Sequence, residues 1–415
     1  MPDYQITIDG ETVHGLFQGD SGLARLLEQV LNQVLEAQVS EHLGAERYER
    51  TDERQGCRNG VRPRKLTTRV GQLTLRVPQV REGQFSPELF ARYQRSEQAL
   101  VLALMEMVVN GVSTRKVSAI TEELCGTSFS KSTVSALCAR LDPLVAAWNE
   151  RPLGEQAFPF VLADALVVKV REQERVRALS ALIAIAIGIN AAGYREILGS
   201  QLGDSESEGS WTTFFAWLKR RGLAGVDLVV SDAHTGLVAA VQRHFPGCTW
   251  QRCQTHLAGD VLEAAPKSLR QELHAHLRTL FEASDLPTAR VLVQQVLETC
   301  ASHAPKAMAC LEGGFDDATA VLALPEPYRR RLRTSNGMER LNEEVRRRER
   351  VIRIFPNRAS AIRLLGAVLM ERHEQWTTGH RSFDMATYWQ WRQEQQASAT
   401  AASHLTSLQQ KARGQ

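Results

Sequence analysis

The alternation of strand-length apolar segments with helical patterns between residues 158 and 253 constrains the fold more than any other feature of the sequence. The apolar segments lie at residues 158–168, 180–190, 193–199, 228–231 and 249–253. Helical patterns separate the later ones, at about residues 209–221 and then up to His244. Strands that alternate with helices are typical of an α/β sheet covered by helices. We therefore expect a multidomain α/β protein with this sheet at its centre.

Two aspartates occupy distinctive places in this region. Asp164 lies inside an apolar strand pattern, where an unpartnered carboxylate is costly to bury. It could instead lie at a sheet edge, or pair with Lys169 or Arg171. Asp232 follows the segment at residues 228–231, and ligand sites of α/β sheets gather at the carboxyl ends of strands. Its alternative role is an N-cap of the helix that follows, although Ser231 or Thr235 could also serve as the cap.

A third carboxylate, Glu339, begins an arginine-rich helical pattern. Asn336 precedes it by three residues, which is the spacing of a capping box in which the glutamate only binds a backbone N–H. On a helix, however, Glu339 shares a face with Glu343, Arg346 and Arg350, and arginines there could bind phosphate groups. Glu343, one turn further on, is the rival of Glu339 for a ligand position. Asp164, Asp232 and Glu339 together offer the hard oxygen ligands that Mg²⁺ prefers.

Basic residues are concentrated in two blocks, although the formal net charge is only +3. Eight basic residues and no acidic one lie between Arg54 and Arg81, and ten arginines against four glutamates lie between Arg329 and Arg353. Such blocks are either solvated charged faces or the footprint of a polyanion. Since the second block adjoins Glu339, we expect nucleic acid as the partner, with Arg340, Arg346, Arg347 and Arg350 as DNA contacts.

The N-terminal part indicates further DNA-binding elements. Residues 21–43 form an amphipathic helical pattern, expected either in the core or at a dimer contact. A β-hairpin is expected around Gly71-Gln72, and it places Arg69 and Arg76 along a DNA backbone unless the ribbon is merely solvated. Residues 97–141 predict three helices, the third capped by Ser130, so that Lys131 would face the major groove in a helix-turn-helix. Ordinary packing of three helices would produce the same pattern.

The composition excludes several classes of protein. A chain of 415 residues is long enough for about two or three domains. No apolar run approaches the roughly 18 residues of a membrane helix, so no membrane partner is expected. The N-terminus lacks the pattern of a secretory signal, and seven scattered cysteines indicate reduced thiols. These features predict a cytoplasmic protein, which would associate with the nucleoid when bound to DNA.

Several ordered motifs resemble those of the mutator-type transposases of bacterial insertion sequences. They lie at residues 164–171, 193–207, 231–236, 250–256 and 334–356, within a similarity that runs from about residue 20 to residue 376. The resemblance implies an RNase H-like core, a mixed sheet with flanking helices, in which Asp164, Asp232 and Glu339 are the catalytic, metal-binding acids. It also implies two Mg²⁺ ions, for which Mn²⁺ could substitute, and DNA as substrate.

The resemblance also draws attention to a few neighbouring residues. It includes the Cys253-x-x-His256 motif after the second acid, which we expect to be a structural pair under the active site; a zinc site, the alternative, would need further ligands. His234, beside Asp232, and Asp204 are expected to support the metal ligands. Asp204, with Glu206 and Glu208, could instead stabilise the following helix through its dipole.

The expected domain organisation follows from these assignments. Residues 1–95 form a DNA-binding or dimerisation region with the basic hairpin, and residues 96–150 a helix-turn-helix-like region. The core spans residues 155–256 and 334–376, interrupted by an all-helical insertion at residues 257–333, and residues 377–415 are a polar, mobile tail.

The predicted function is that of a DNA transposase, which binds the terminal inverted repeats of an insertion sequence, cleaves strands with Mg²⁺ and transfers them to target DNA. Because two ends must be held together, a homodimer or higher oligomer on DNA is expected. A non-catalytic DNA-binding regulator and an RNase H-like structure-selective nuclease are the alternatives.

Overall fold

The chain folds into two units, residues 1–140 and residues 141–415. The computed structural model describes residues 5–16, 22–52, 54–81, 85–87, 96–125, 129–154, 156–172 and 175–397. The boundary between the two units lies between Arg140 and Leu141, whereas the sequence predicted domain boundaries near residues 95 and 150. Within the described part, no helix combines the length and the apolar character needed to cross a membrane.

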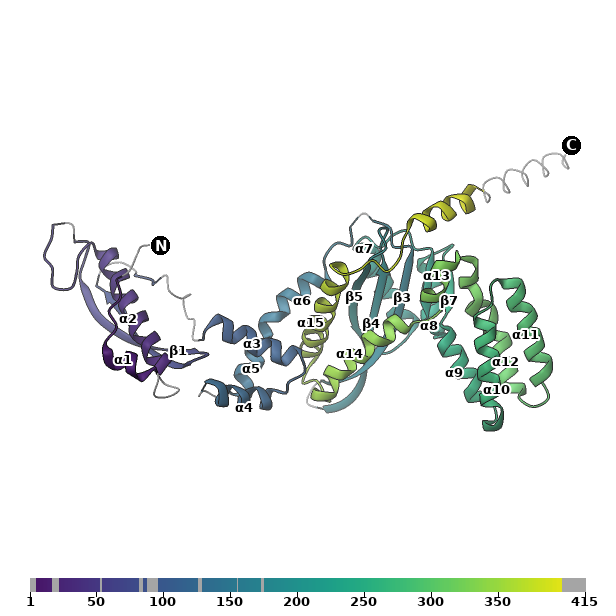
Figure 1. Ribbon diagram of the computed structural model, residues 1–415, viewed down its shortest axis with the longest axis horizontal. Coiled ribbons are helices and arrows are strands. Elements are labelled where there is room, and N and C mark those ends of the chain that lie inside the picture. The colour runs from purple at the N-terminus through teal and green to yellow at the C-terminus, as the bar shows by residue number, and fades with distance from the viewer. Residues whose placement is uncertain are drawn as a thin grey trace. The chain divides into compact units, whose positions relative to one another are not determined.

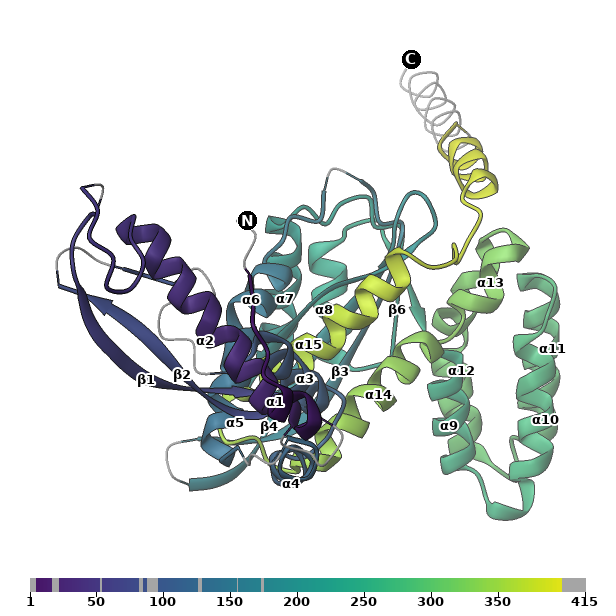
Figure 2. The ribbon, with the colours of Figure 1, turned by 60° about the vertical axis from the view of Figure 1, so that its left-hand side comes forward.

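The first unit begins with a helix packed on a β-hairpin. After the short helix α1 (Gly10–Gly15), α2 (Gly22–Leu43) lies along the ribbon of β1 (Arg58–Thr68) and β2 (Gly71–Val80) (Figure 2). Leu35 of α2 is fully buried together with Leu73 and Leu75 of β2. The apolar stripe predicted at residues 21–43 therefore packs against the chain's own hairpin. The turn falls at Arg69-Val70, two residues earlier than expected, because Thr68 pairs with Gly71.

Three helices complete the first unit, and they confirm the three helical patterns. These are α3 (Gln98–Val109), α4 (Thr114–Cys125) and α5 (Lys131–Cys138). Ser130 caps α5 as predicted, since its side chain accepts a hydrogen bond from the backbone N–H of Thr133. Leu104, Val117 and Val134, one from each helix, are fully buried.

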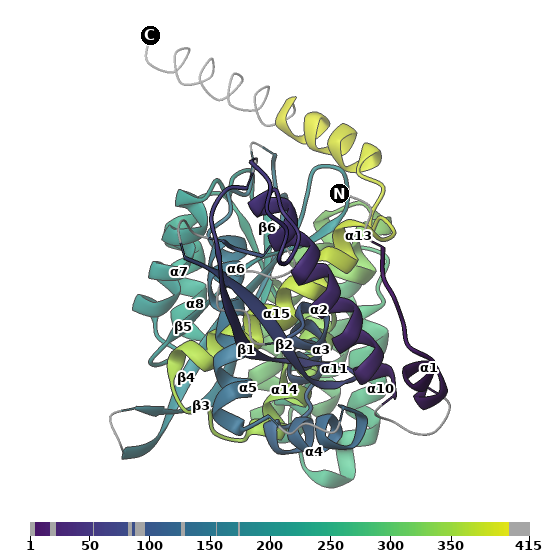
Figure 3. The same ribbon diagram turned by 90° about the vertical axis from the view of Figure 1, so that its left-hand side faces the viewer.

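The second unit is built on a five-stranded mixed sheet, which confirms the α/β class (Figure 1). Its strands are β3 (Phe160–Glu172), β4 (Arg175–Ile189), β5 (Arg195–Gly203), β6 (Leu228–Ser231) and β7 (Thr249–Arg252), in the order β5-β4-β3-β6-β7. The first three strands are antiparallel to one another, whereas β6 runs parallel to β3 and β7 parallel to β6. The β3–β4 hairpin continues past the end of β5 (Figure 3).

Helices cover both faces of the sheet. Val161 and Ala163 of β3 face α7 (Glu208–Arg220) and α8 (Thr235–His244), where the buried rings of Trp211, Phe214 and Phe215 fill the space. Since side chains alternate along a strand, Leu162 and Asp164 point to the other face. There α14 (Asn336–Ile352) and α15 (Arg358–Thr377) lie across the strands, and α6 (Asp142–Asn149) packs against α15 (Figure 1).

An all-helical segment separates β7 from α14, as predicted. It contains α9 (Gln254–Ala264), α10 (Arg270–Phe281), α11 (Leu286–Cys300), α12 (Pro305–Thr319) and α13 (Glu326–Leu332). Helices α9 to α12 share an apolar core of their own. The segment begins at Gln254, slightly before the predicted residue 257, because the strand β7 ends at Arg252.

The expectation of a mobile tail from residue 377 is wrong for its first part. Phe383, Met385 and Tyr388 are buried, and residues 386–397 are helical. The ring of Tyr388 meets that of Phe160 of β3 edge-on, with 4.7 Å between the centroids, and its hydroxyl donates a 2.5 Å hydrogen bond to Asp227. A few aromatic side chains thus fix a segment of otherwise polar composition. Residues 398–415 lie outside the described part.

Candidate active site

Asp164 lies on the central strand of the sheet, on the face that α14 covers. This position excludes the sheet edge, and no ion pair joins Asp164 to Lys169 or Arg171 in the described structure. Its carboxylate instead accepts hydrogen bonds from the backbone N–H of Ala165 at 2.8 Å and from Nδ2 of Asn342 at 2.5 Å. The sequence did not indicate Asn342 as a partner, because the bond depends on how α14 packs on β3.

Burial and neighbouring charges shift the pKa of Asp164. Its pKa is raised to about 6, mainly by burial, and the negative charges of Asp232 and Glu206 contribute to this rise. The N–H of Ala165 and the charge of His256 act in the opposite direction. Salt screens the interaction between charges that lie more than about 10 Å apart, so Asp164, Asp232 and Glu206 belong to one cluster.

Asp232 follows directly after β6, at the carboxyl end of that strand. The N-cap of α8 is His234, and its backbone N–H donates a 3.3 Å hydrogen bond to Oδ1 of Asp232. Neither Asp232 nor the other caps considered from the sequence, Ser231 and Thr235, takes the cap position. The half-buried Asp232 carboxylate thus stays near Asp164.

Glu339 lies in the first turn of α14. The helix begins at Asn336 after Ser335, and no side-chain capping bond forms there, so the capping-box alternative is wrong. Oε1 of Glu339 instead accepts a hydrogen bond from Oγ of Ser335 at 3.3 Å. Glu339 is half-buried, whereas Glu343, its rival one turn further on, is exposed.

Cys253 and His256 lie beside Glu339. The buried sulfur of Cys253 accepts hydrogen bonds from the backbone N–H and the hydroxyl of Ser335, at 3.3 and 3.2 Å. The pKa of the His256 imidazole is raised to about 9, mainly by its hydrogen bond with Cys253; burial opposes this rise, and the charges of Glu339 and Asp164 contribute to it. His256 therefore connects Glu339 electrostatically with Asp164.

A metal ion could also use this group. The ligand atoms of Cys253, His256 and Glu339 lie within 4.8 Å of one another. The sequence did not place Glu339 in this set. Three donors fall short of the four that a structural zinc site requires, and no other such cluster occurs among the described residues.

Glu206 is closer to the cluster than Asp204, which was the residue expected there. Its carboxylate lies 3.7 Å from Nδ1 of His234 and accepts a 3.3 Å hydrogen bond from the indole of Trp211. Burial raises the pKa of Glu206, and the charge of Asp232 contributes. Asp204 is exposed and pairs with Arg358 at the start of α15. The acidic loop after β5 was the available signal in the sequence, but the sequence does not show which of its acids points inward.

The predicted DNA-binding residues have different surroundings. On α14, Arg340, Arg346 and Arg350 are exposed, whereas Arg347 forms two 3.0 Å bonds with Glu344. In the first unit, Arg76 and Lys131 are exposed, and Arg69 pairs with Glu97 at 3.1 Å. Arg347 and Arg69 would have to exchange these acids for phosphate.

Comparisons with known proteins agree on one family. A family model described as "Transposase, Mutator family" matches residues 5–379. A transposase for insertion sequence element IS256 in transposon Tn4001 of Staphylococcus aureus is 44% identical over 388 residues, which cover 92% of this chain and 99% of that protein. The transposase for element ISRM5 of Rhizobium meliloti is 45% identical over 370 residues, 89% of this chain and 92% of that protein. The transposase for element IS1081 of Mycobacterium tuberculosis is 40% identical and covers 88% of each chain.

Proposed function

Because this chain belongs to the Mutator family of transposases, we propose that it moves an insertion sequence by cutting DNA at the terminal inverted repeats and joining the freed ends to target DNA. The observation that carries the proposal is the clustering of acids from distant segments. The negative charge of Asp232 raises the pKa of Asp164, and the negative charges of Asp164 and Glu339 both raise the pKa of His256. Strand cleavage and strand transfer both need such a site beside the scissile phosphate.

The sheet of the second unit supports an RNase H-like core as part of this proposal. Three antiparallel strands are followed by helix, strand, helix and strand, and the last two strands are parallel to β3. In this interpretation Asp164 comes from the first strand, Asp232 from the end of the fourth, and Glu339 from the helix after the all-helical insertion.

The residues at the site fit Mg²⁺. Asp164, Asp232 and Glu339 offer carboxylate oxygens, the donors that this cation prefers. Burial is the main cause of the raised pKa of Asp164, and the negative charges of Asp232 and Glu206 contribute to it; a bound cation would offset both effects. Within the described part of the chain, the buried Oδ1 of Asn342 has no hydrogen-bond partner. When bound, a pair of divalent ions supplies charge stabilisation at phosphorus and a lower pKa for the attacking water or hydroxyl, and Mn²⁺ should substitute.

The chain's own groups then have separate tasks. Asn342 orients the carboxylate of Asp164, and Ser335 orients that of Glu339. The exposed Arg340, Arg346 and Arg350 attract the DNA backbone, while Arg76 and Lys131 do so in the first unit. Since two element ends must be joined together, the active form is proposed to be a homodimer or higher oligomer on DNA.

One experiment separates this function from its alternatives. Purified protein is incubated with a plasmid that carries the DNA flanking its own reading frame, for wild type and Asp232→Asn in parallel. We expect Mg²⁺-dependent nicks at the element ends and joined products, both lost in the variant, which should still bind DNA. Binding without nicking under any divalent ion would instead indicate a regulator. Cleavage of branched DNA without joined product would indicate a structure-selective nuclease.

A further inference from the structure

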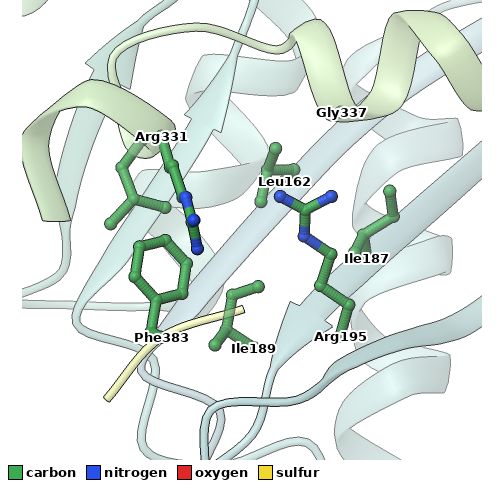
Figure 4. Close-up of a pocket in the computed structure, with 8 residues that line it drawn as sticks. Leu162, Ile187, Ile189, Arg195, Arg331, Gly337 and Phe383 are labelled. Atoms are coloured by element: carbon green, nitrogen blue, oxygen red, sulfur yellow. The ribbon is translucent and has the colours of Figure 1, made fainter. Parts of the chain in front are cut away.

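A pocket adjoins the candidate active site on the face of the sheet that carries Asp164. Its apolar wall is formed by Leu162, Ile187 and Ile189 from the strands and by Phe383 (Figure 4). Gly337 of α14 also lines the pocket. Leu162 lies two residues before Asp164 on the same strand face, and Gly337 lies two residues before Glu339. The pocket is therefore next to two of the catalytic acids.

Two guanidinium groups point into this pocket. Arg195 extends from the start of β5, and Arg331 extends from α13 on the opposite side (Figure 4). The guanidinium of Arg331 lies 5.5 Å from the ring centre of Phe383. Arg195 reaches the first turn of α14, because a Cβ atom added to Gly337 would lie 3.7 Å from its Nη1. Arg340, one turn along α14, adds a third positive charge.

These positive charges lack acidic partners. Within the described structure, no hydrogen bond or ion pair joins the side chains of Arg195, Arg331 or Arg340 to a carboxylate. Burial lowers the pKa of Arg195, and the charges of Arg331 and Arg340 lower it further. The positive end of the α14 dipole also favours an anion at this place. Three repelling guanidinium groups beside a helix N-terminus match a phosphate group, which arginine binds through parallel hydrogen bonds.

We propose that Arg195, Arg331 and Arg340 bind a backbone phosphate of the DNA strand that enters the active site. This inference rests on the proposed function and specifies which part of the substrate the pocket takes. The pocket adjoins Asp164 and Glu339, so the phosphate bound there is a neighbour of the scissile one. Binding it would fix the position of the strand along the sheet and align the scissile phosphate with the carboxylates.

The test measures DNA affinity as a function of salt. A duplex oligonucleotide with the sequence of one element end is titrated with full-length protein, without divalent ions, at several NaCl concentrations. Arg195→Gln and Arg331→Gln should each weaken binding about tenfold. Each should also lower the slope of log affinity against log salt by about one. Arg195→Lys should keep the wild-type slope because it keeps the charge.

The matched control is Arg220→Gln. Arg220 is exposed on α7, which covers the opposite face of the sheet, so affinity and slope should not change. Melting temperatures verify that each variant is folded. A wild-type slope in both pocket variants would overturn the proposal, even if affinity fell. It would also be overturned if inorganic phosphate raised the melting temperature of wild type alone while the variants bound DNA normally, because the pocket would then take free phosphate.

The proposed function can fail separately. If wild type neither nicks nor joins DNA in Mg²⁺ but the pocket variants show the reduced slope, the phosphate site stands and the transposase proposal does not. If wild type nicks and joins while the slopes are unchanged, only the phosphate site is lost.

Discussion

Nδ2 of Asn342 donates a 2.5 Å hydrogen bond to Oδ2 of Asp164, although the two residues are 178 positions apart. The bond joins the central strand β3 to α14, the helix that carries Glu339. Glu339 and Asn342 are three residues apart and therefore lie on neighbouring parts of one helix face. A single side-chain contact thus orients Asp164 and sets the distance between Asp164 and Glu339, the two proposed catalytic acids on these elements.

We expect Asn342→Ala to slow Mg²⁺-dependent cleavage about 10–100-fold, the usual effect of removing a group that orients a metal ligand. DNA binding should be unaffected. The initial rate of plasmid nicking, measured across a Mg²⁺ titration, should show a higher Mg²⁺ requirement.

Gln294→Ala is the control for the Asn342 experiment, because it removes an amide-to-carboxylate bond of 2.8 Å on an exposed helix. It should cleave like wild type. A wild-type rate for Asn342→Ala at every Mg²⁺ concentration would show that Asp164 needs no such support.

Asp164→Asn should abolish cleavage and yet stabilise the metal-free protein. The folded pKa of Asp164 is about 6, above its ordinary value of 3.8, so the folded state binds this proton more tightly than the unfolded state. Protonated Asp164 therefore contributes stability that is fully present below about pH 4. This contribution is lost as the pH rises from about 4 to about 6, where Asp164 ionises in the folded state. Above this window the asparagine variant should be more stable by about 1–3 kcal/mol.

Denaturant unfolding at pH 7.5 and at pH 4, without divalent ions, measures this difference. The gain should be present at pH 7.5 and nearly absent at pH 4. Added Mg²⁺ should raise the melting temperature of wild type more than that of the variant. Equal stability of the two proteins at pH 7.5 would contradict the assigned origin of the shift.

The strands that carry Asp164 and Asp232 could be predicted because their apolar patterns are local and their order limits the possible sheets. The places of Asn342 and Glu206 at the site could not be predicted. Helical periodicity placed Glu339 and Glu343 on one face, but only the packing of α14 on β3 decides which of them approaches the sheet. The same holds for Glu206, since the acidic loop after β5 offers several carboxylates at similar spacing.

The segment after α15 shows why composition misleads over short stretches. Gln, Ala, Ser and Thr dominate the average, and the average predicted a mobile tail. Phe383, Met385 and Tyr388 are nevertheless enough to attach this segment to the sheet, because all three are buried and the rings of Phe383 and Tyr388 contact that of Phe160. A long-range cluster of this kind leaves no periodic signal.

Cys253→Ala should lower the free energy of unfolding by about 1–3 kcal/mol, because the buried backbone N–H of Ser335 loses its acceptor and the Ser335 hydroxyl keeps only Glu339 as an acceptor. Cleavage should fall as well, since Ser335 is the N-cap of α14 and contacts Glu339. We expect no zinc in wild-type protein by elemental analysis, and no change in melting temperature with a strong chelator. One zinc per chain, lost in Cys253→Ala, would assign the cluster to a metal instead.

Truncation after Gly379 should strongly destabilise the second unit, although the family model also ends at that residue. The truncation removes Phe383, Met385 and Tyr388, and burial of each such side chain is worth about 1.5–3 kcal/mol. It also leaves Asp227 without the hydroxyl of Tyr388 and the guanidinium of Arg392.

Truncation after Ala397 keeps all of these contacts and is the control, for which the melting temperature should equal that of the full chain. Tyr388→Phe separates the two effects, because it keeps the ring and removes only the hydrogen bond, at a cost of about 1 kcal/mol. If the protein ending at Gly379 melted like the full chain, the aromatic cluster would contribute nothing to the stability of the sheet.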